Sequence, residues 1–466
     1  MRGKRVLVLG LGRHGGGIGT ALWAVRGGAE VVVTDLASES DLRPALAELE
    51  GLPIRYRLGG HDPADLDWAD VVIRSPAVPN HAPILAQARE RGVPVTTEMA
   101  IFFESARGQT IGVTGSKGKT TTSSIVHHIV SDSYAWAKAL GNMGVSAVQH
   151  ADMPANGVAT IEISSFQAEG LTEQGLAPSV LVVTNLLEDH LDRYDNDIEL
   201  YHEAKARLLD GQGPDGWAIL PSSPYERGRL GPRVKGRRAY FQVRDHPLPD
   251  GADGVWRSGE VLRSRWAERE FELLPVEELP LGADHYVSNV AAATCAALAA
   301  GVSPGRVSAR LRTLELVPHR QEPVAVVDGV SYINDTTATI PAAAAASISS
   351  YPSGYIYLIA GGADKALDTT PLVEAIAQHV AGVSFLKGTA TAAMIDRLRR
   401  HGYGAISGPH SSMAAAVSDA RARAAIGDTV LLAPGAASFG LFSNEFDRGE
   451  KFRQAVHDLD VRNDAA

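Results

Sequence analysis

The residues best suited to chemistry lie in one short run, Thr-Gly-Ser-Lys-Gly-Lys-Thr-Thr at positions 114–121. Glycines let backbone N–H groups close on phosphate oxygens, and the start of a helix adds a favourable partial positive charge. Lys119 is placed to reach the outer phosphates of a nucleotide, and the Thr120 hydroxyl is placed to ligate Mg²⁺. The run therefore predicts a binding loop for a nucleoside triphosphate.

The glycine spacing of this loop differs from the usual pattern, which has four residues between its first glycine and Gly-Lys. Five residues separate Gly112 from Gly118, and two separate Gly115 from Gly118. The alternative interpretation is a glycine-rich turn without a ligand. The position favours a phosphate loop, because an apolar strand-like run ends here and a helical pattern begins.

Other reactive side chains follow the apolar runs downstream. A carboxylate at Glu162 is placed to hold Mg²⁺ bridging nucleotide phosphates, and a salt bridge is the alternative. The metal role is favoured because an acid between two isoleucines is costly to bury without a partner. His190 lies among acids and suits a metal or phosphate site, although a lone histidine is more often structural. Lys205, by itself, is typical of a surface lysine.

A second glycine pattern, Gly10-x-Gly12-x-x-Gly15, follows the apolar run at residues 6–9. Asp35 lies twenty residues after Gly15, as in a dinucleotide-binding fingerprint. By itself the pattern indicates that a diphosphate- or ribose-bearing group docks here. The alternative is a set of glycines that serves only a tight turn.

Strand-like and helical runs alternate through three stretches, about 1–107, 108–317 and 318–466. This alternation predicts an α/β protein with an N-terminal Rossmann-like domain, a central P-loop ATPase-type parallel sheet and a C-terminal Rossmann-like domain. We expect ligands at the carboxyl ends of the strands. Residues 211–275, including the run 238–241, instead suggest β hairpins.

Polar side chains also gather at predicted strand ends of the third stretch. Arg320, Asp335 and Lys365 follow or join apolar runs, and the run 436–439 with Ser438 follows the last strand. Their convergence at one edge of an α/β unit suits an anionic ligand.

The chain has 466 residues, 45% of them hydrophobic and 21% charged, and a formal net charge of −10. An acidic balance argues against nucleic acid as a partner, because a general grip on phosphates needs a basic face. The only cysteine is Cys295, so no internal disulfide forms, which fits a reducing compartment. No apolar run approaches the ~20 residues of a membrane-spanning helix. We expect a cytoplasmic monomer without membrane insertion.

Taken together, the motifs resemble the Mur ligase family over nearly the full length of the chain. Within the family they are most similar to the branch that adds D-glutamate to UDP-N-acetylmuramoyl-L-alanine. Ser-Ser-Phe-Gln after Glu162 is the branch-specific part. The resemblance is carried by residues 114–121, 141–144, 162–167 and 188–194, by Lys205 and Asn289, by His319-Arg320-x-Glu322 and by Asn334-Asp335-x-x-Ala338-Thr339.

The resemblance implies an ADP-forming amide ligase of peptidoglycan precursor synthesis that uses ATP and Mg²⁺ and forms an acyl phosphate. The implied catalytic residues are Lys119, His190 and Lys205, the last typically carbamylated in this family. The implied metal ligands are Thr120, Glu162, His190 and carbamylated Lys205. ATP would be bound by Gly115, Ser116, Lys117, Gly118, Lys119, Thr120, Thr121, Asn289, Arg320 and Asp335. The UDP substrate would be bound by Gly12, Arg13, His14, Gly15, Asp35, Ser75, Asn142, Ser164 and Gln167, and the incoming glutamate by Thr339, Lys365 and Ser438.

Two positions near the expected amino-acid pocket depart from the branch. Thr337 stands where the branch often has lysine, and Glu445-Phe446 reverses a common Phe-Glu order. The same ligation with L-glutamate or another acidic amino acid is therefore the alternative. An NAD-dependent oxidoreductase would explain the first glycine pattern but would leave the phosphate loop, Glu162 and His190 unexplained.

Overall fold

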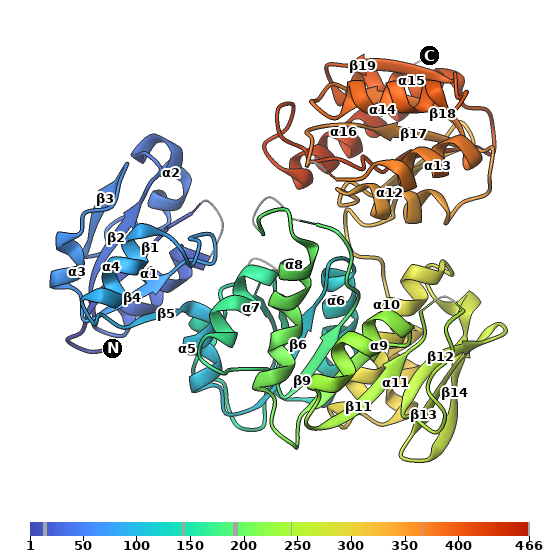
Figure 1. Ribbon diagram of the computed structural model, residues 1–466. Helices are drawn as coiled ribbons and strands as arrows, with labels where there is room; N and C mark the ends of the chain where they lie inside the picture. Colours follow the sequence, from blue (N-terminus) through green and yellow to red (C-terminus); the bar gives the residue numbers. More distant parts are fainter. Residues whose placement is uncertain (13–15, 142–144, 190–193, 244, 366, 465–466) are drawn as a thin grey trace. The chain divides into compact units, whose positions relative to one another are not determined.

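The computed structural model describes residues 1–466 apart from 13–15, 142–144, 190–193, 244, 366 and 465–466. It contains three mostly parallel β-sheets with helices, which confirms the predicted α/β class (Figure 1). The chain forms two compact units. Residues 1–187, 199–279 and 288–313 make the first unit, and residues 188–198, 280–287 and 314–466 make the second. The predicted domain boundaries remain predictions. Among the described residues, no helix has the length and apolar character needed to cross a membrane.

The N-terminal sheet has five parallel strands in the order β3-β2-β1-β4-β5. Alternate side chains of its central strand enter two separate cores, with Val6 and Val8 on one face and Leu7 and Leu9 on the other. Both faces are covered, which explains why the strand is apolar throughout. The strands are β1 (Arg5–Leu9), β2 (Glu30–Asp35), β3 (Ile54–Leu58), β4 (Val71–Arg74) and β5 (Val95–Thr97). The helices are α1 (Gly16–Arg26), α2 (Glu39–Ala47), α3 (Ala64–Trp68), α4 (Pro83–Glu90) and α5 (Glu98–Ser105).

The second sheet has nine strands in the order β14-β13-β12-β11-β10-β9-β6-β8-β7. The strands are β6 (Gln109–Thr114), β7 (Ala137–Gly141), β8 (Val158–Glu162), β9 (Val180–Val183), β10 (Trp217–Pro221), β11 (Arg237–Phe241), β12 (Gly254–Ser258), β13 (Val261–Trp266) and β14 (Arg269–Pro275). The helices are α6 (Lys119–Val130), α7 (Ser165–Thr172), α8 (Ile198–Ala206), α9 (Pro224–Leu230), α10 (Asp284–Ala299) and α11 (Pro304–Leu311), with a short 3₁₀ helix η2 (Ala147–His150).

The hairpins expected between residues 211 and 275 are confined to β12, β13 and β14, which pair antiparallel. The expectation was wrong for the run 238–241, because β11 pairs parallel to β10. Helix α9 lies between these two strands in the chain and supplies the crossover that parallel neighbours require.

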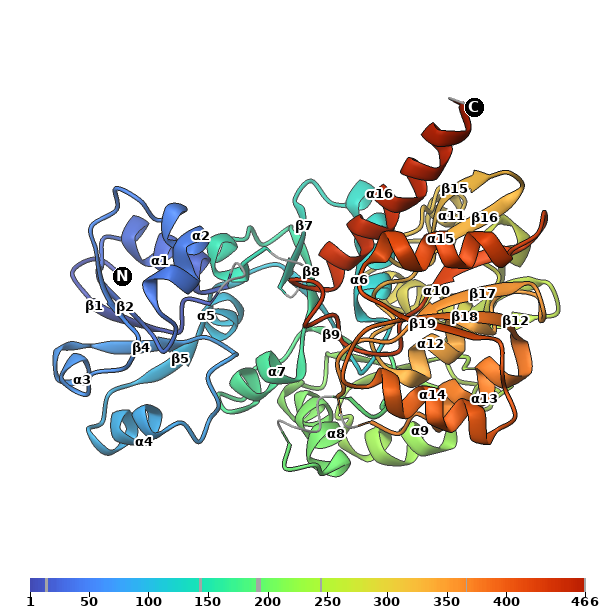
Figure 2. The same ribbon diagram turned by 90° about the horizontal axis from the view of Figure 1, so that it is seen from above.

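The C-terminal sheet has the order β15-β16-β20-β17-β18-β19, with only β15 antiparallel to its neighbour. One face packs on α12, α13 and α14, and the other packs on α15 and α16, which lie side by side (Figure 2). The strands are β15 (Glu322–Val327), β16 (Val330–Asn334), β17 (Ile356–Ala360), β18 (Val380–Leu386), β19 (Ile406–His410) and β20 (Thr429–Leu432). The helices are α12 (Pro341–Ile348), α13 (Thr370–His379), α14 (Thr391–Arg400), α15 (Met413–Arg423) and α16 (Glu445–Asp464).

Candidate active site

The phosphate loop connects β6 to α6 at the carboxyl edge of the second sheet. Its two glycines adopt positive φ, +137° at Gly115 and +80° at Gly118, and Gly118 precedes the first residue of α6. A Cβ at Gly115 would lie 2.0 Å from the Thr184 hydroxyl oxygen, so a side chain has no room there. The observed conformation therefore requires glycine, as the sequence pattern indicates.

Side chains at the end of β9 hold this loop in place. The Asn185 side chain accepts from the Lys117 amide at 2.9 Å and donates to the Lys117 carbonyl at 3.0 Å. Ser116 donates to the Leu187 carbonyl at 2.7 Å. The Lys119 ammonium donates to the carbonyls of Gly115 and Ser116, each at 2.9 Å. The loop is thus held in shape by the protein, and sequence reasoning missed Asn185 although it directly follows an apolar strand.

Glu162 and Asn289 lie with the phosphate loop in the first unit. Glu162 ends β8, which pairs with β6 so that Glu162 stands opposite Val113, and only 2% of the residue is exposed. Asn289 of α10 accepts from the Thr122 hydroxyl at 3.4 Å, and its side-chain oxygen lies 2.4 Å from the Cβ position of Gly118. The fold therefore brings Asn289 to the first turns of α6 and to Gly118, although it lies 167 positions after Thr122 in the sequence.

Lys205 is buried on α8, with 1% of the residue exposed. Its ammonium nitrogen lies 3.1 Å from the centre of the Tyr201 ring. The interpretation of Lys205 as a surface lysine, based on the residue alone, was wrong. Lysine is rarely buried this deeply in proteins, so Lys205 is not an ordinary surface residue.

The first glycine loop is organised by Asp35 at the end of β2. One carboxylate oxygen accepts from the amides of Leu11 and Gly12 at 2.8 and 3.1 Å, and the other accepts from the Ala37 amide at 2.8 Å. Ser75 lies at the same edge, with its Cβ 3.0 Å from the Cβ position of Gly10. Asp35 therefore shapes the loop, a role that sequence reasoning did not assign. The predicted site residues Arg13, His14, Gly15, Asn142 and His190 lie outside the described residues.

Ser164 and Gln167 cap the start of α7. The Ser164 hydroxyl accepts from the Gln167 amide at 3.2 Å, while the Gln167 side chain accepts from the Ser164 amide at 3.0 Å. Reciprocal bonds of this kind satisfy donors that a helix start leaves unpaired. The two predicted substrate contacts thus also fix the start of the helix that follows Glu162.

In the second unit, three loops with predicted ligand-binding residues meet at the carboxyl edge of the C-terminal sheet. The loop after β16 carries Asp335 and Thr339, the loop after β17 carries Lys365, and the loop after β20 carries Ser438. Backbone bonds join the three loops: Gly435 donates to Ala338 at 2.9 Å, and Ala363 and Ala437 exchange bonds at 2.8 and 3.0 Å. The fold therefore brings together the loops that carry Thr339, Lys365 and Ser438.

Lys365 donates to a carboxylate oxygen of Asp189 at 2.9 Å. Asp189 is buried and the lysine is partly exposed, with 4% and 23% of their side chains accessible. A cation held by one buried carboxylate remains available to a second anion at its exposed side. Sequence reasoning placed Asp189 only in a motif and did not assign it this role.

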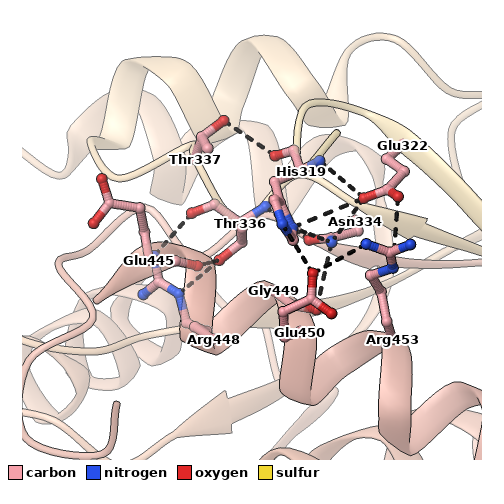
Figure 3. Close-up of polar contacts among 10 residues, drawn as sticks. All are labelled: His319, Glu322, Asn334, Thr336, Thr337, Glu445, Arg448, Gly449, Glu450 and Arg453. Carbon is pink, nitrogen blue, oxygen red and sulfur yellow. Dashed lines mark hydrogen bonds and ion pairs between the residues drawn. The ribbon is translucent and has the colours of Figure 1, made fainter. Parts of the chain in front are cut away.

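The buried Arg448 joins two of these loops to α16, and Figure 3 shows its bonds to Thr336. The Arg448 guanidinium donates to the Thr336 carbonyl at 2.8 Å, the Thr336 hydroxyl at 3.0 Å and the Ala436 carbonyl at 3.1 Å. Arg448 is fully buried, and burial lowers the pKa of its guanidinium to about 10 while the charge of Glu445 opposes that shift. Sequence reasoning missed this residue, since a lone arginine on an amphipathic helix is typical of a surface position.

The same figure shows how the loop that carries Arg320 is fixed at its preceding residue, His319. The Thr337 hydroxyl donates to the His319 carbonyl at 3.2 Å, and the Asn334 side chain donates to the His319 ring Nδ1 at 3.0 Å. Nδ1 is then an acceptor, and the ring proton lies on Nε2, which faces Glu450 at 3.2 Å. The threonine at position 337 is thus bonded to the backbone at His319.

With this geometry established, comparison with known proteins decides the family. Residues 113–297 match the family described as Mur ligase middle domain, and residues 4–97 match the Mur ligase MurD-like N-terminal domain. A protein of Roseiflexus sp. (strain RS-1), named UDP-N-acetylmuramoylalanine–D-glutamate ligase, is 40% identical over 98% of this chain and 99% of its own. The chain belongs to the Mur ligase family. A protein of the same name from Acidobacterium capsulatum is 35% identical over 98% of this chain and 96% of its own.

Solved structures agree with the fold of this Mur ligase. UDP-N-acetylmuramate-alanine ligase of Thermotoga maritima matches with a TM-score of 0.61 at 18% identity, covering 98% of this chain and 99% of that one. The MurF ligase of the same organism, solved with ADP, also gives 0.61 at 18% identity, covering 99% and 96%. Membership in a family of ATP-dependent ligases leaves no role for the oxidoreductase alternative.

Proposed function

We propose that this Mur ligase joins D-glutamate to UDP-N-acetylmuramoyl-L-alanine, with ATP as the energy source. The observation that carries the proposal is the phosphate loop, preformed by Asn185 and paired with Asn289 and buried Glu162. The relatives of matching length carry the corresponding enzyme name. Cytoplasmic location and a monomeric state remain predictions.

The available ligands fit Mg²⁺. Among the described residues, no group of three or more His, Cys, Asp or Glu side chains is placed to hold a metal ion. Mg²⁺ bound with a nucleotide needs only one or two protein oxygens, because phosphates and waters complete its shell. We propose the Glu162 carboxylate and the Thr120 hydroxyl as those oxygens, with His190 as a further ligand. The metal would offset the charge of the phosphates when bound.

The reaction proposed for these residues has two steps. The alanine carboxylate attacks the γ-phosphorus of ATP and ADP leaves, while the Lys119 ammonium offsets the repulsion between the two anions. The amine of glutamate then attacks the acyl carbon, releasing phosphate and losing a proton. Lys365, Thr339 and Ser438 would hold the glutamate so that its amine is oriented toward the acyl phosphate.

Replacing Lys365 by methionine is expected to raise the KM for D-glutamate about 10- to 100-fold, because a charge-assisted bond to a substrate carboxylate is lost. The KM for ATP should stay within about twofold. Initial rates of ADP formation at varied glutamate and varied ATP measure both. The exposed Lys451, which pairs with Asp447 at 3.1 Å, provides the control variant Lys451→Met. Equal effects on both KM values would contradict the assigned role.

Lys205 tests the proposed carbamylation. Carbamylation would turn this buried lysine into an anion able to ligate a second Mg²⁺. Lys205→Ala is expected to lose activity by about 10²-fold or more and to regain part of it when a short carboxylate such as formate is added. Phosphate release measures both effects, with the exposed Lys235→Ala as control. Loss of activity without any rescue in a folded variant would argue for a structural lysine.

The choice of amino acid is the open part of the proposal. Thr337 contributes a hydroxyl bonded to His319 where the branch often has a lysine, and Glu445 brings a carboxylate to the start of α16. Because both residues differ from the branch, the alternative substrate is L-glutamate or another acidic amino acid. A substrate panel with ATP, UDP-N-acetylmuramoyl-L-alanine and each glutamate enantiomer decides between them, since the product forms only with the accepted enantiomer.

A further inference from the structure

Glu98 is a buried carboxyl group of the first unit that lies beside the starts of α1 and η2. It is the first residue of α5, and 4% of the residue is exposed. The Ser146 hydroxyl, at the start of η2, donates to one of its oxygens. The other oxygen lies 3.6 Å from the Cβ position of Gly16, the first residue of α1. In the sequence Gly16 directly follows the first glycine pattern, and Ser146 directly follows Val145, whose carbonyl accepts from the Gly141 amide.

Close packing holds this carboxyl group in place. A Cβ at Gly19 of α1 would lie 2.3 Å from the Ser146 Cβ, and a Cβ at Gly17 would lie 2.3 Å from the Leu11 carbonyl oxygen. The glycine-rich start of α1 therefore lets the helix approach both the loop that precedes it and the residue that binds Glu98. A carboxyl group in so tight a space has little room for the water that an ionised form needs.

We propose that Glu98 is a positioning residue for the UDP-bearing substrate, and that its carboxyl group must be protonated for the substrate diphosphate to bind well in the adjoining glycine loop. The inference rests on the proposed function, which assigns that loop to the diphosphate. A protonated Glu98 joins α5 to Ser146 without placing a charge beside α1. An ionised Glu98 places a negative charge near the start of α1, where the diphosphate would otherwise gain from the helix partial charge.

The electrostatics around Glu98 agree with this assignment. Burial raises the pKa of Glu98 to about 7, and the bond from Ser146 partly opposes the rise. Among the described residues, the elements around Glu98 contain few charged side chains. The only charged residue of helix α1 is Arg26, in its last turn. The helix η2 has His150, and burial lowers the pKa of this histidine. Glu169 of α7 contacts Asn80, and Glu173, directly after α7, contacts Arg74.

The test measures binding of UDP-N-acetylmuramoyl-L-alanine to the full chain by calorimetry, without ATP, so that no reaction occurs. Affinity is expected to fall about tenfold as the pH rises from about 6 to about 8.5. Glu98→Gln keeps the shape and cannot ionise, so its affinity should stay near the high value at both pH values. Burial lowers the pKa of His61 while the charge of Asp35 opposes that shift, so this histidine also contributes to the wild-type pH profile, and the difference from Glu98→Gln is the readout.

Ser146→Ala supplies a second, independent readout. Because the bond from Ser146 stabilises the ionised carboxylate, its loss should move the pH at which affinity falls to a higher value. An unchanged midpoint would overturn the proposal. A Glu98→Gln variant with the wild-type pH profile, or one with equally weak binding at both pH values, would also overturn it. Failure of the wild type to bind the substrate at any pH would instead reject the proposed function.

Stability measurements test the titration of Glu98 without any substrate. The folded-state pKa lies above the ordinary value near 4.5, so the folded state binds more protons than the unfolded state between about 4.5 and 7. The free energy of unfolding of the wild type, relative to Glu98→Gln, should therefore fall as the pH rises through this window and level off above it. A flat difference would show that Glu98 does not titrate there.

Discussion

Replacing Lys119 by alanine is expected to lower turnover about 10³-fold in the presence of ATP, UDP-N-acetylmuramoyl-L-alanine and D-glutamate. A carboxylate and a triphosphate are both anions, and the lysine is the cation that the loop places at the outer phosphates. Removing one such stabilising group from a transferring phosphoryl group costs about 3–4 kcal/mol of transition-state stabilisation. Continuous measurement of ADP formation gives the rate.

The exposed Lys138 on β7 provides the matched control, since Lys138→Ala removes the same side chain from the same sheet away from the loop. The shape of the loop should survive in Lys119→Ala, because Asn185 and Thr184 hold the Lys117 backbone independently. Calorimetric unfolding checks that the variant is folded. Near-normal turnover in a folded Lys119→Ala protein would contradict the proposed mechanism.

Replacing Arg448 by methionine is expected to destabilise the second unit by about 3 kcal/mol or more. Methionine fills much of the same volume but leaves the carbonyls of Thr336 and Ala436 without their donors in a fully buried position. Each buried acceptor left unsatisfied costs about 1–3 kcal/mol. Urea-induced unfolding of the full chain, followed by a probe in the C-terminal sheet, measures the change.

A second consequence of Arg448→Met concerns activity. The loops of Thr339 and Ser438 lose their common anchor, so the KM for glutamate should rise more than the KM for ATP. Arg448→Lys keeps the charge without the planar fork and should give an intermediate stability. The exposed Arg399 on α14 supplies the control variant Arg399→Met, expected to change stability by less than about 0.5 kcal/mol. A stable Arg448→Met protein would show that the buried bonds contribute little.

Local patterns predicted most of the fold. Alternation of apolar strands with helices located three α/β stretches, because strands covered on both faces are apolar throughout and glycines mark the turns that follow them. The prediction was wrong at β11, which has the length and composition of a hairpin strand. Its parallel pairing with β10 depends on helix α9, which crosses between the two strands. The residues of the strands alone do not indicate this crossover.

The site residues likewise divide into those that the sequence indicated and those that only the structure revealed. The phosphate loop was recognisable because glycines at positive φ, a lysine and a threonine must be adjacent in sequence to surround a phosphate. Asn185, Asp189 and Arg448 were not recognisable from the sequence. Each bonds to backbone or side-chain groups that are distant in the sequence or lie in another loop. Asp35 was recognised as part of a nucleotide pattern, yet the structure shows its carboxylate bonded to the glycine loop itself.

The sequence by itself determined the chemistry available to this Mur ligase: a phosphate loop, a first glycine loop and a set of polar residues at strand ends. These are local features, fixed by the backbone conformations that glycine permits and by side-chain types. Only the tertiary structure decided that Lys205, Glu98 and Arg448 are buried and which groups they meet. Burial depends on how strands and helices from separate stretches pack together, and it changes the energetic cost of a charge far more than neighbouring residues do.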